Sequence, residues 1–366
     1  MPALTGLRTV LAILIMLFHF TPPHPNFLTP LLANAYVFVG FFFLISGFVL
    51  AYNYADRPIL HLRSFMVARL SRVYPVYALV LVLSIPFLLE EWTAHSRSDF
   101  FLGMLLTPLG LQSWYPPLAT FWNTVAWTVP AEFFLYLLFP FILLYLSRAE
   151  SLLNTPLKLC AAVLVVWLVG LIPHTIYLLL NPDHVVGNAD RFTYGYWIAL
   201  VKYSPPSYIW TFTAGVLLAR LHKMVEFAPR HRFWLAAVAL AGLGFFFAFA
   251  VWRIPYVIIH GCLLLPLFAM LLLGLAGPNP LAAAFAWRPL VKIGEATLSL
   301  YLIHFNGFLL IHQYHLPERL HLAWADPWIS YAVLVAVAIA ILRLYEGPAR
   351  RFVLRNFGNA SYAKSR

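Results

Sequence analysis

Two side chains able to exchange protons stand inside long apolar stretches of this sequence. Residues 9–20 read TVLAILIMLFHF, which places His19 at the end of a run suited to lipid. Glu132, in AWTVPAEFFLYLLFP, is expected about midway along another such run, where a carboxylate is costly and marks a candidate functional site. A neutral imidazole is a common general base, so His19 could serve in proton transfer. Each residue would also fit a structural role as a hydrogen-bonding group between helices.

The polar residues around Glu132 follow a helical period. Thr124, Thr128, Glu132 and Tyr136 are spaced four apart, which predicts one polar row on an otherwise apolar helix, facing the protein interior. Pro130 is expected to kink this helix and to free the backbone carbonyl four residues before it. The sequence therefore predicts a carboxylate close to an exposed backbone acceptor and a cavity.

A second histidine is expected at a similar depth in the membrane. His304, in SLYLIHFNGF, shares a helical row with Thr297 and Tyr301 and approaches from the opposite direction. His19 lies eleven residues beyond Arg8, roughly 16 Å along a helix, so it falls in the middle or outer half if Arg8 marks the inner surface. We expect a structural or substrate-contacting role for His304.

Two arginines are spaced to hold an anion. The segment FMVARLSRVYPVY places Arg69 and Arg72 three apart, on one face if helical, immediately before a helix that Pro75 could begin. Two guanidiniums beside a helix N-terminus suit phosphates, particularly several joined in one ligand. The alternative is that the pair only reflects the basic composition of cytoplasmic loops.

Small residues mark the preceding apolar segment, VGFFFLISGFVL. Gly40 and Gly47 are seven apart on one helical face, which predicts close helix packing or the close approach of a ligand. Ser46 would line a cavity or bond a backbone carbonyl.

Membrane helices must position these side chains, because 62% of the 366 residues are hydrophobic and only 10% are charged. The chain is expected to be an all-α integral membrane protein, a bundle of about ten transmembrane helices. The stretch 98–114 is too short for a confident crossing, and we expect it to be interfacial or re-entrant. The predicted crossings are 6–21, 33–53, 74–92, 120–147, 157–180, 205–221, 233–252, 257–276, 290–313 and 328–346.

Basic residues predict the orientation, because cytoplasmic loops hold an excess of Lys and Arg. With both termini cytoplasmic, the net charge of +11 belongs to the inner membrane surface rather than to nucleic-acid binding. The residues assigned to the inner side are Arg57, Arg63, Arg69, Arg72, Arg148, Lys158, Arg220, Lys223, Arg230, Arg232, Arg288, Lys292 and the segment 343–366. The residues assigned to the outer side are Arg97, Arg191, Lys202, Arg253 and Arg319.

Six segments in this order resemble the membrane acyltransferase-3 family. They are ALTGLRTVLAILIMLFHF, VGFFFLISGFVL, RLSRVYP, AWTVPAEFFLYLLFP, IGEATLSLYLIHF and YEGPAR. The resemblance implies one ten-helix domain over residues 1–350, followed by a short basic cytoplasmic tail at 351–366. It also implies an O-acyltransferase of the inner (plasma) membrane, with acyl-CoA, by default acetyl-CoA, as cytoplasmic co-substrate. The implied acceptor is a carbohydrate hydroxyl at the outer side, of an exopolysaccharide, a lipopolysaccharide or another glycan.

The resemblance also implies roles for individual residues. His19 matches the essential first-helix histidine, Arg69 and Arg72 match an R-x-x-R pair, and Glu132 matches the glutamate of a W-S-x-x-x-E type motif. We expect His19 to act as general base, and Glu132 to orient the acceptor or stabilise the charged imidazole. The donor site is expected to include Arg8, Ser46, Arg69 and Arg72. The substrate or supporting residues are expected to be Trp127, Thr128, Tyr136, Tyr301, His304 and Asn306. The chain departs from the family pattern at Thr5, where an aspartate is usual, and at Thr128, where a serine is usual.

Two other functions use the same residues. A transporter for a polysaccharide or small solute would use intramembrane Glu and His as a proton relay, but the sequence shows no inverted repeats. A scaffold protein would tolerate Glu132→Gln without loss of function. We expect no bound metal or permanent cofactor. The acceptor, the acyl chain length, the choice between direct transfer and an acyl-enzyme, and the oligomeric state are not determined by the sequence.

Overall fold

Helices are the only regular secondary structure among the residues that the computed structural model describes, 1–54 and 61–358, and no strand occurs there. Eight segments there are long and apolar enough to cross a membrane. They are Pro2–His19 (α1), Asn26–Tyr54 (ending in α3, Phe38–Tyr54), Leu62–Leu83 (α4), Thr128–Arg148 (α7), Pro156–Leu180 (α8), Pro229–Arg253 (beginning with α11, Pro229–Phe245), Tyr256–Leu275 (α12, Tyr256–His260, and α13, Leu265–Leu275) and Trp328–Phe357 (α18, Trp328–Ile341, and α19, Gly347–Phe357). The expected class, an all-α multi-pass membrane protein, is confirmed.

Two further expected crossings are not single straight helices of full length. The segment expected at 290–313 is a pair of helices, α15 (Arg288–Glu295) and α16 (Thr297–Gln313), that meet at an angle of 71°. The segment expected at 205–221 is α10 (Ile209–Met224), whose 16 residues fall short of the length of the other spans. By length and composition, the described residues therefore contain eight candidate spans, or nine if the bent pair counts as one, against about ten expected.

The start of the span expected at 74–92 is wrong. Helix α4 begins at Leu62 and continues through Pro75, so both Arg69 and Arg72 are helical. The early turns form because Phe65, Ala68 and other small or apolar residues recur at helical spacing and are buried. Pro75 removes only one backbone donor, the one that would bond the residue four positions earlier.

The start of the span expected at 120–147 is also wrong. Helix α7 begins at Thr128, and Thr124 lies in the preceding turns, so the polar row contains only its last three members. Pro130 therefore lies in the first helical turn, where no intrahelical N–H is needed, and does not kink the helix. The carbonyl of Ala126, expected to be exposed, accepts the Gln112 side-chain amide at 3.2 Å.

Short helices occupy the rest of the described chain. The stretch expected at 98–114 contains a helix of only ten residues, α6, followed by turns. Residues 351–357 of the expected tail are helical, as part of α19. Arg57 and residues 359–366, which the sequence assigns to the basic inner surface, lie outside the described residues. The short helices are α2 (Thr29–Leu32), α5 (Leu88–Ala94), α6 (Arg97–Leu106), α9 (Tyr196–Tyr203), α14 (Pro280–Phe285) and α17 (Leu316–Arg319).

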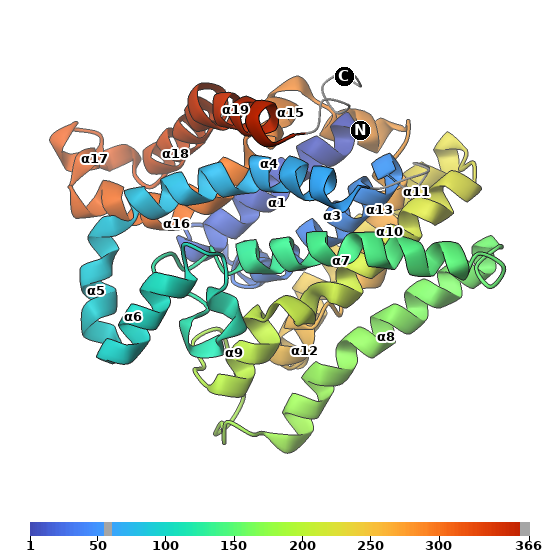
Figure 1. The fold of residues 1–366 in the computed structure, drawn as a ribbon, viewed down its shortest axis with the longest axis horizontal. Helices are drawn as coiled ribbons and strands as arrows, with labels where there is room; N and C mark the ends of the chain where they lie inside the picture. Colours follow the sequence, from blue (N-terminus) through green and yellow to red (C-terminus); the bar gives the residue numbers. More distant parts are fainter. Residues whose placement is uncertain (55–60, 359–366) are drawn as a thin grey trace.

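Helix α1 runs from one edge of the bundle into its middle (Figure 1). Its first residues lie at the upper right, near α15 and α19, and its last residues point into the middle of the molecule. Helices α5, α6, α9, α12 and α17 lie towards the left and the bottom, away from the start of α1. Helix α1 packs against α3, α14, α15 and α16, so side chains from several spans can meet along its length.

Helices α3 and α10 pack against each other more extensively than any other pair of described helices. Glycines at their contact let the two backbones approach closely. A Cβ atom at Gly47 would lie 2.1 Å from the carbonyl oxygen of Phe212, and one at Gly215 would lie 2.2 Å from that of Leu44. The packing expected for Gly47 is therefore present. Gly40, expected on the same contact face, has no neighbouring atom within 4 Å of the position that a Cβ would take, and it has no part in the contact.

The two glycines of α3 give a matched stability prediction. Gly47→Ala is expected to destabilise the protein by about 1–3 kcal/mol, because the methyl group meets a backbone carbonyl that cannot move independently of α10. Gly40→Ala meets open space and is expected to leave the stability unchanged or slightly raised, since alanine favours a helix. Thermal denaturation of both variants in detergent measures the difference. Equal melting temperatures would contradict the α3–α10 contact.

Candidate active site

His19 is the last residue of α1, and its imidazole lies against two rings of α16. The ring centroid is 5.2 Å from that of His304 and 5.1 Å from that of Phe305. Within the described part of the chain the His19 side chain forms no hydrogen bond. Its ring nitrogens are therefore available to a substrate. The two histidines that the sequence places at similar depths are brought together.

The hydrogen bonding of His304 defines which of its nitrogens can accept a proton. Its Nδ1 atom lies 2.7 Å from the carbonyl oxygen of Tyr301, and because a carbonyl only accepts, Nδ1 carries the hydrogen. In the neutral ring Nε2 is then an acceptor. This Nε2 atom is buried without a hydrogen-bond partner, in a residue that is 1% exposed. His304 thus presents a free proton acceptor beside His19.

A second polar cluster surrounds Arg8, about 16 Å before His19 along α1. The charge of Arg8 interacts with those of Arg72, Glu132 and Glu346. Glu132 also accepts a short hydrogen bond from the Tyr136 hydroxyl, one helical turn further along α7. The structure therefore groups Glu132 with Arg8 and Tyr136, and shows no contact between Glu132 and His19.

The arginine pair of α4 lies at the same level as Arg8. Arg69 donates to the Tyr54 hydroxyl at 3.1 Å and lies over the rings of Tyr54 and Phe65, 5.5 and 5.8 Å from their centroids. Arg72 interacts electrostatically with Arg8 and with Tyr136. Because both arginines lie inside α4, the expected help from a helix N-terminus is absent, and the neighbouring guanidiniums provide the positive charge instead.

Glu346 belongs to this cluster, although its position in the sequence does not predict a role. It ends a π-helical turn, Leu342–Glu346, and its carboxylate accepts the Ser299 hydroxyl at 3.0 Å while only 6% of the residue is exposed. Its charge interacts with those of Arg72 and Arg8. The only sign of Glu346 in the sequence is that it belongs to YEGPAR, one of the six segments of the family resemblance. A glutamate at the end of an apolar run ordinarily lies in solvent, so this position alone predicts no buried role. The wider π turn, which changes the direction of the side chain, is not evident from the sequence.

The inner cluster has an excess of positive charge. The charges of Arg8, Arg72 and Arg350 act on Glu346, and that of Arg8 also acts on Glu132, while Arg69 and Arg72 act on Tyr136. Such a set of preorganised guanidiniums is suited to an anionic ligand with several oxygens. The described residues include no group of three or more His, Cys, Asp or Glu side chains that could hold a metal ion.

Aromatic side chains connect the two clusters. The Tyr301 ring lies 5.7 Å from His304 and 6.3 Å from Phe42, and the Arg8 guanidinium lies 6.0 Å from the Phe42 ring. The Thr128 hydroxyl interacts with that of Tyr301 and donates to a backbone carbonyl in the preceding turn. The expected residues Thr128 and Tyr301 therefore lie between the imidazole pair and the arginines.

Trp127 and Ser46 have more limited contacts. Trp127 packs on the rings of Tyr203 and Tyr208, with centroids 5.2 and 5.3 Å away. Ser46 is half-buried on α3, and its hydroxyl forms no hydrogen bond with the described residues.

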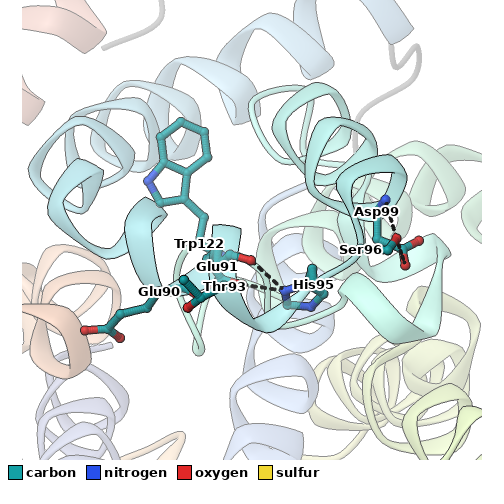
Figure 2. A network of polar contacts seen from close by, with 7 residues as sticks. All are labelled: Glu90, Glu91, Thr93, His95, Ser96, Asp99 and Trp122. Atoms are coloured by element: carbon teal, nitrogen blue, oxygen red, sulfur yellow. Dashed lines mark hydrogen bonds and ion pairs between the residues drawn. The ribbon is translucent and has the colours of Figure 1, made fainter.

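Asn306 holds the backbone of the turn before α7. Its side-chain amide donates to the Trp122 carbonyl, and the Asn123 amide donates to the Leu302 carbonyl, both at 3.0 Å. The same turn is bonded from the other side, where the Glu91 carboxylate accepts the Trp122 N–H at 2.9 Å and forms an ion pair with His95 at 3.2 Å (Figure 2). Burial raises the pKa of the Glu91 carboxyl, and the hydrogen bond from Trp122 opposes this shift. Asn306 thus links α16 to this turn through its side chain.

Comparison with known proteins indicates acyl transfer as the activity of this family. A family model described as an acyltransferase domain matches residues 1–344. The acyltransferase MdmB of Streptomyces mycarofaciens is 26% identical over 359 residues, which cover 93% of this chain and 87% of the relative. No solved structure matches the chain.

Proposed function

Since the chain belongs to the membrane acyltransferase-3 family, we propose that it transfers an acyl group from acyl-CoA to a hydroxyl of a carbohydrate acceptor. It is a multi-pass membrane acyltransferase. The finer assignments proposed are the inner (plasma) membrane, acetyl-CoA as the donor from the cytoplasm, and a glycan at the outer side as the acceptor.

The arrangement along α1 is the observation that best supports this proposal. One end of the helix carries Arg8 within a cluster of guanidiniums, and the other carries His19 beside a free proton acceptor. Coenzyme A has the matching form, because its phosphates are joined to the thioester by a long flexible arm. We assign the phosphates to Arg8, Arg69 and Arg72, and the thioester to the space beside His19.

The proposed reaction needs one base and one proton return. His19 takes the proton of the acceptor hydroxyl as its oxygen attacks the thioester carbonyl, which forms the new C–O bond. The C–S bond then breaks, and the proton on His19 passes to the leaving thiolate to give free coenzyme A. His304 Nε2 has no hydrogen-bond partner among the described residues, and we propose that it accepts one from His19 once that ring has taken the proton, as the third group of a catalytic triad does.

Glu132 has a different role from the one expected from the sequence. Together with Glu346 it balances part of the charge of Arg8 and Arg72, which keeps the guanidiniums oriented while no ligand is bound. The remaining positive charge attracts the donor phosphates. The Glu132 carboxylate thus supports donor binding, while His304 takes the place of the carboxylate beside the base.

Acetyl-CoA binding and turnover by the wild-type protein test this function. Protein in nanodiscs is expected to bind radiolabelled acetyl-CoA saturably and to release free coenzyme A faster when membrane glycans are added. The absence of any affinity for acetyl-CoA would contradict the proposal. Proton-coupled solute flux in liposomes would then favour the transporter, which uses the same intramembrane residues.

A further inference from the structure

A pair of cations lies on the far side of His19 from the Arg8 cluster. Arg191 comes from the loop between α8 and α9, and its guanidinium donates to the Phe18 carbonyl at 3.3 Å. It lies 5.0 Å from the centroid of the Phe18 ring, and its charge acts on His19. The Arg191 residue as a whole is exposed.

Lys202 supplies the second cation from the helix that follows this loop. The residue is only 3% exposed, and its ammonium group donates to the Arg191 carbonyl at 3.4 Å. It lies over the rings of Tyr203 and Tyr256, 5.1 and 5.3 Å from their centroids. Burial lowers the pKa of Lys202 to about 8, so the ammonium remains the main form at pH 7.

The acidic residues of this loop form no ion pair with the two cations, although the charge of Asp190 acts on Lys202. Both carboxylate oxygens of Asp183 accept backbone N–H groups at the start of α9, at 3.1 and 2.7 Å. The Asp190 carboxylate accepts the backbone N–H of Phe192 and the hydroxyl of Thr193. Across the described residues, neither Arg191 nor Lys202 forms an ion pair with a carboxylate. A buried cation without a direct ion pair is costly, which favours a ligand that supplies negative charge in contact with it.

Unpaired polar atoms lie next to the same residues. The Tyr36 ring packs on Phe18 and stacks on His260, with centroids 5.7 and 5.4 Å away. Tyr36 is 9% exposed and its hydroxyl has no hydrogen-bond partner, nor has the buried Nδ1 atom of His260. The charge of Lys202 acts on His260. These groups offer further hydrogen bonds to a ligand held by the cations.

We propose that Arg191 and Lys202 form an acceptor subsite that binds an anionic group, a carboxylate or a phosphate, carried by the acceptor near its acylated hydroxyl. The subsite is separate from the inner cluster, because its residues contact Phe18 and His19 rather than Arg8. This inference rests on the proposed function, and it narrows the acceptor to a negatively charged glycan.

Three sugars that differ only at one position test the subsite. Methyl glucoside is neutral, methyl glucuronide carries a carboxylate, and methyl glucoside 6-phosphate carries a phosphate. Binding to the wild-type protein in nanodiscs is expected to be at least about 10-fold tighter for the charged sugars, as one charge-assisted contact predicts. Arg191→Gln combined with Lys202→Met is expected to remove this preference, whereas the conservative variant Arg191→Lys is expected to keep part of it. Comparison of the two charged sugars distinguishes a uronate from a phosphate acceptor.

The controls separate this inference from the proposed function. Arg319→Gln removes an exposed arginine of α17, also assigned to the outer side, and is expected to keep the preference for charged sugars. Equal binding of all three sugars, binding of none, or a preference that survives in the double variant would overturn the subsite. Acetyl-CoA binding is measured on the same preparations. If it is present while the anion preference is absent, only the acceptor inference fails.

Discussion

The variant His19→Ala is expected to lower the rate of acyl transfer by about 10³-fold, within the range typical for loss of a general base. Alanine cannot take the proton of the acceptor hydroxyl. Release of free coenzyme A in nanodiscs, with and without glycan acceptor, measures the loss. Acetyl-CoA binding is expected to persist, since the arginine cluster lies about 16 Å away along α1.

A matched control for His19→Ala is His231→Ala. His231 lies in the first turn of α11, is exposed, and has no part in either cluster. Its replacement is expected to leave the rate unchanged. A rate in His19→Ala within a factor of about ten of the wild type would exclude His19 as the base, even if acetyl-CoA still binds.

The double variant Arg69→Ala with Arg72→Ala is expected to lose acetyl-CoA affinity by about 100-fold or more. Hydrogen bonds to charged groups contribute about 1.5–3 kcal/mol each, so two of them give at least about 3 kcal/mol. Equilibrium binding of radiolabelled acetyl-CoA measures the change. The affinity of the wild type is also expected to fall as the salt concentration rises, because the contacts are electrostatic.

The neighbouring arginine of α4 provides the control for this variant. Arg63 stands near the start of the same helix and is exposed. Arg63→Ala removes a positive charge from the same side of the protein but is expected to keep the affinity. If the two variants weaken binding equally, the general surface charge attracts the donor and the assigned phosphate site is incorrect.

Much of the helical framework could be predicted from hydrophobicity alone. Spans of about 20 apolar residues have few alternatives in a membrane, so α1, α3 and α8 occur near the expected positions. The errors at the starts of α4 and α7 run in opposite directions. Helix α4 begins earlier than expected because proline and arginine often mark a loop or the beginning of a helix, whereas here Pro75 lies within α4 and Arg69 is held over aromatic rings. Helix α7 begins later than expected because residues 121–127 form bends and turns.

Candidate residues of the site can be identified from one sequence, whereas the residues that they contact cannot. An imidazole or carboxylate in an apolar run is evident from one sequence, which is why His19, His304 and Glu132 stand out. Which helices pack together depends on contacts between distant parts of the chain. The meeting of His19 with His304, and of Glu132 with Arg8, is therefore visible only in the structure.

The crossed amide bonds between the turn before α7 and α16 have a mechanical consequence. Asn123 donates to Leu302 and Asn306 donates to Trp122, so the two bonds run in opposite directions across one contact. A single bond would allow α16 to pivot about it, whereas two bonds at successive turns resist both sliding and twisting. His304 projects from the stretch between their attachment points. The two amide bonds therefore restrict rotation of α16 around His304. A movement of this part of α16 is expected to carry the turn before α7 with it.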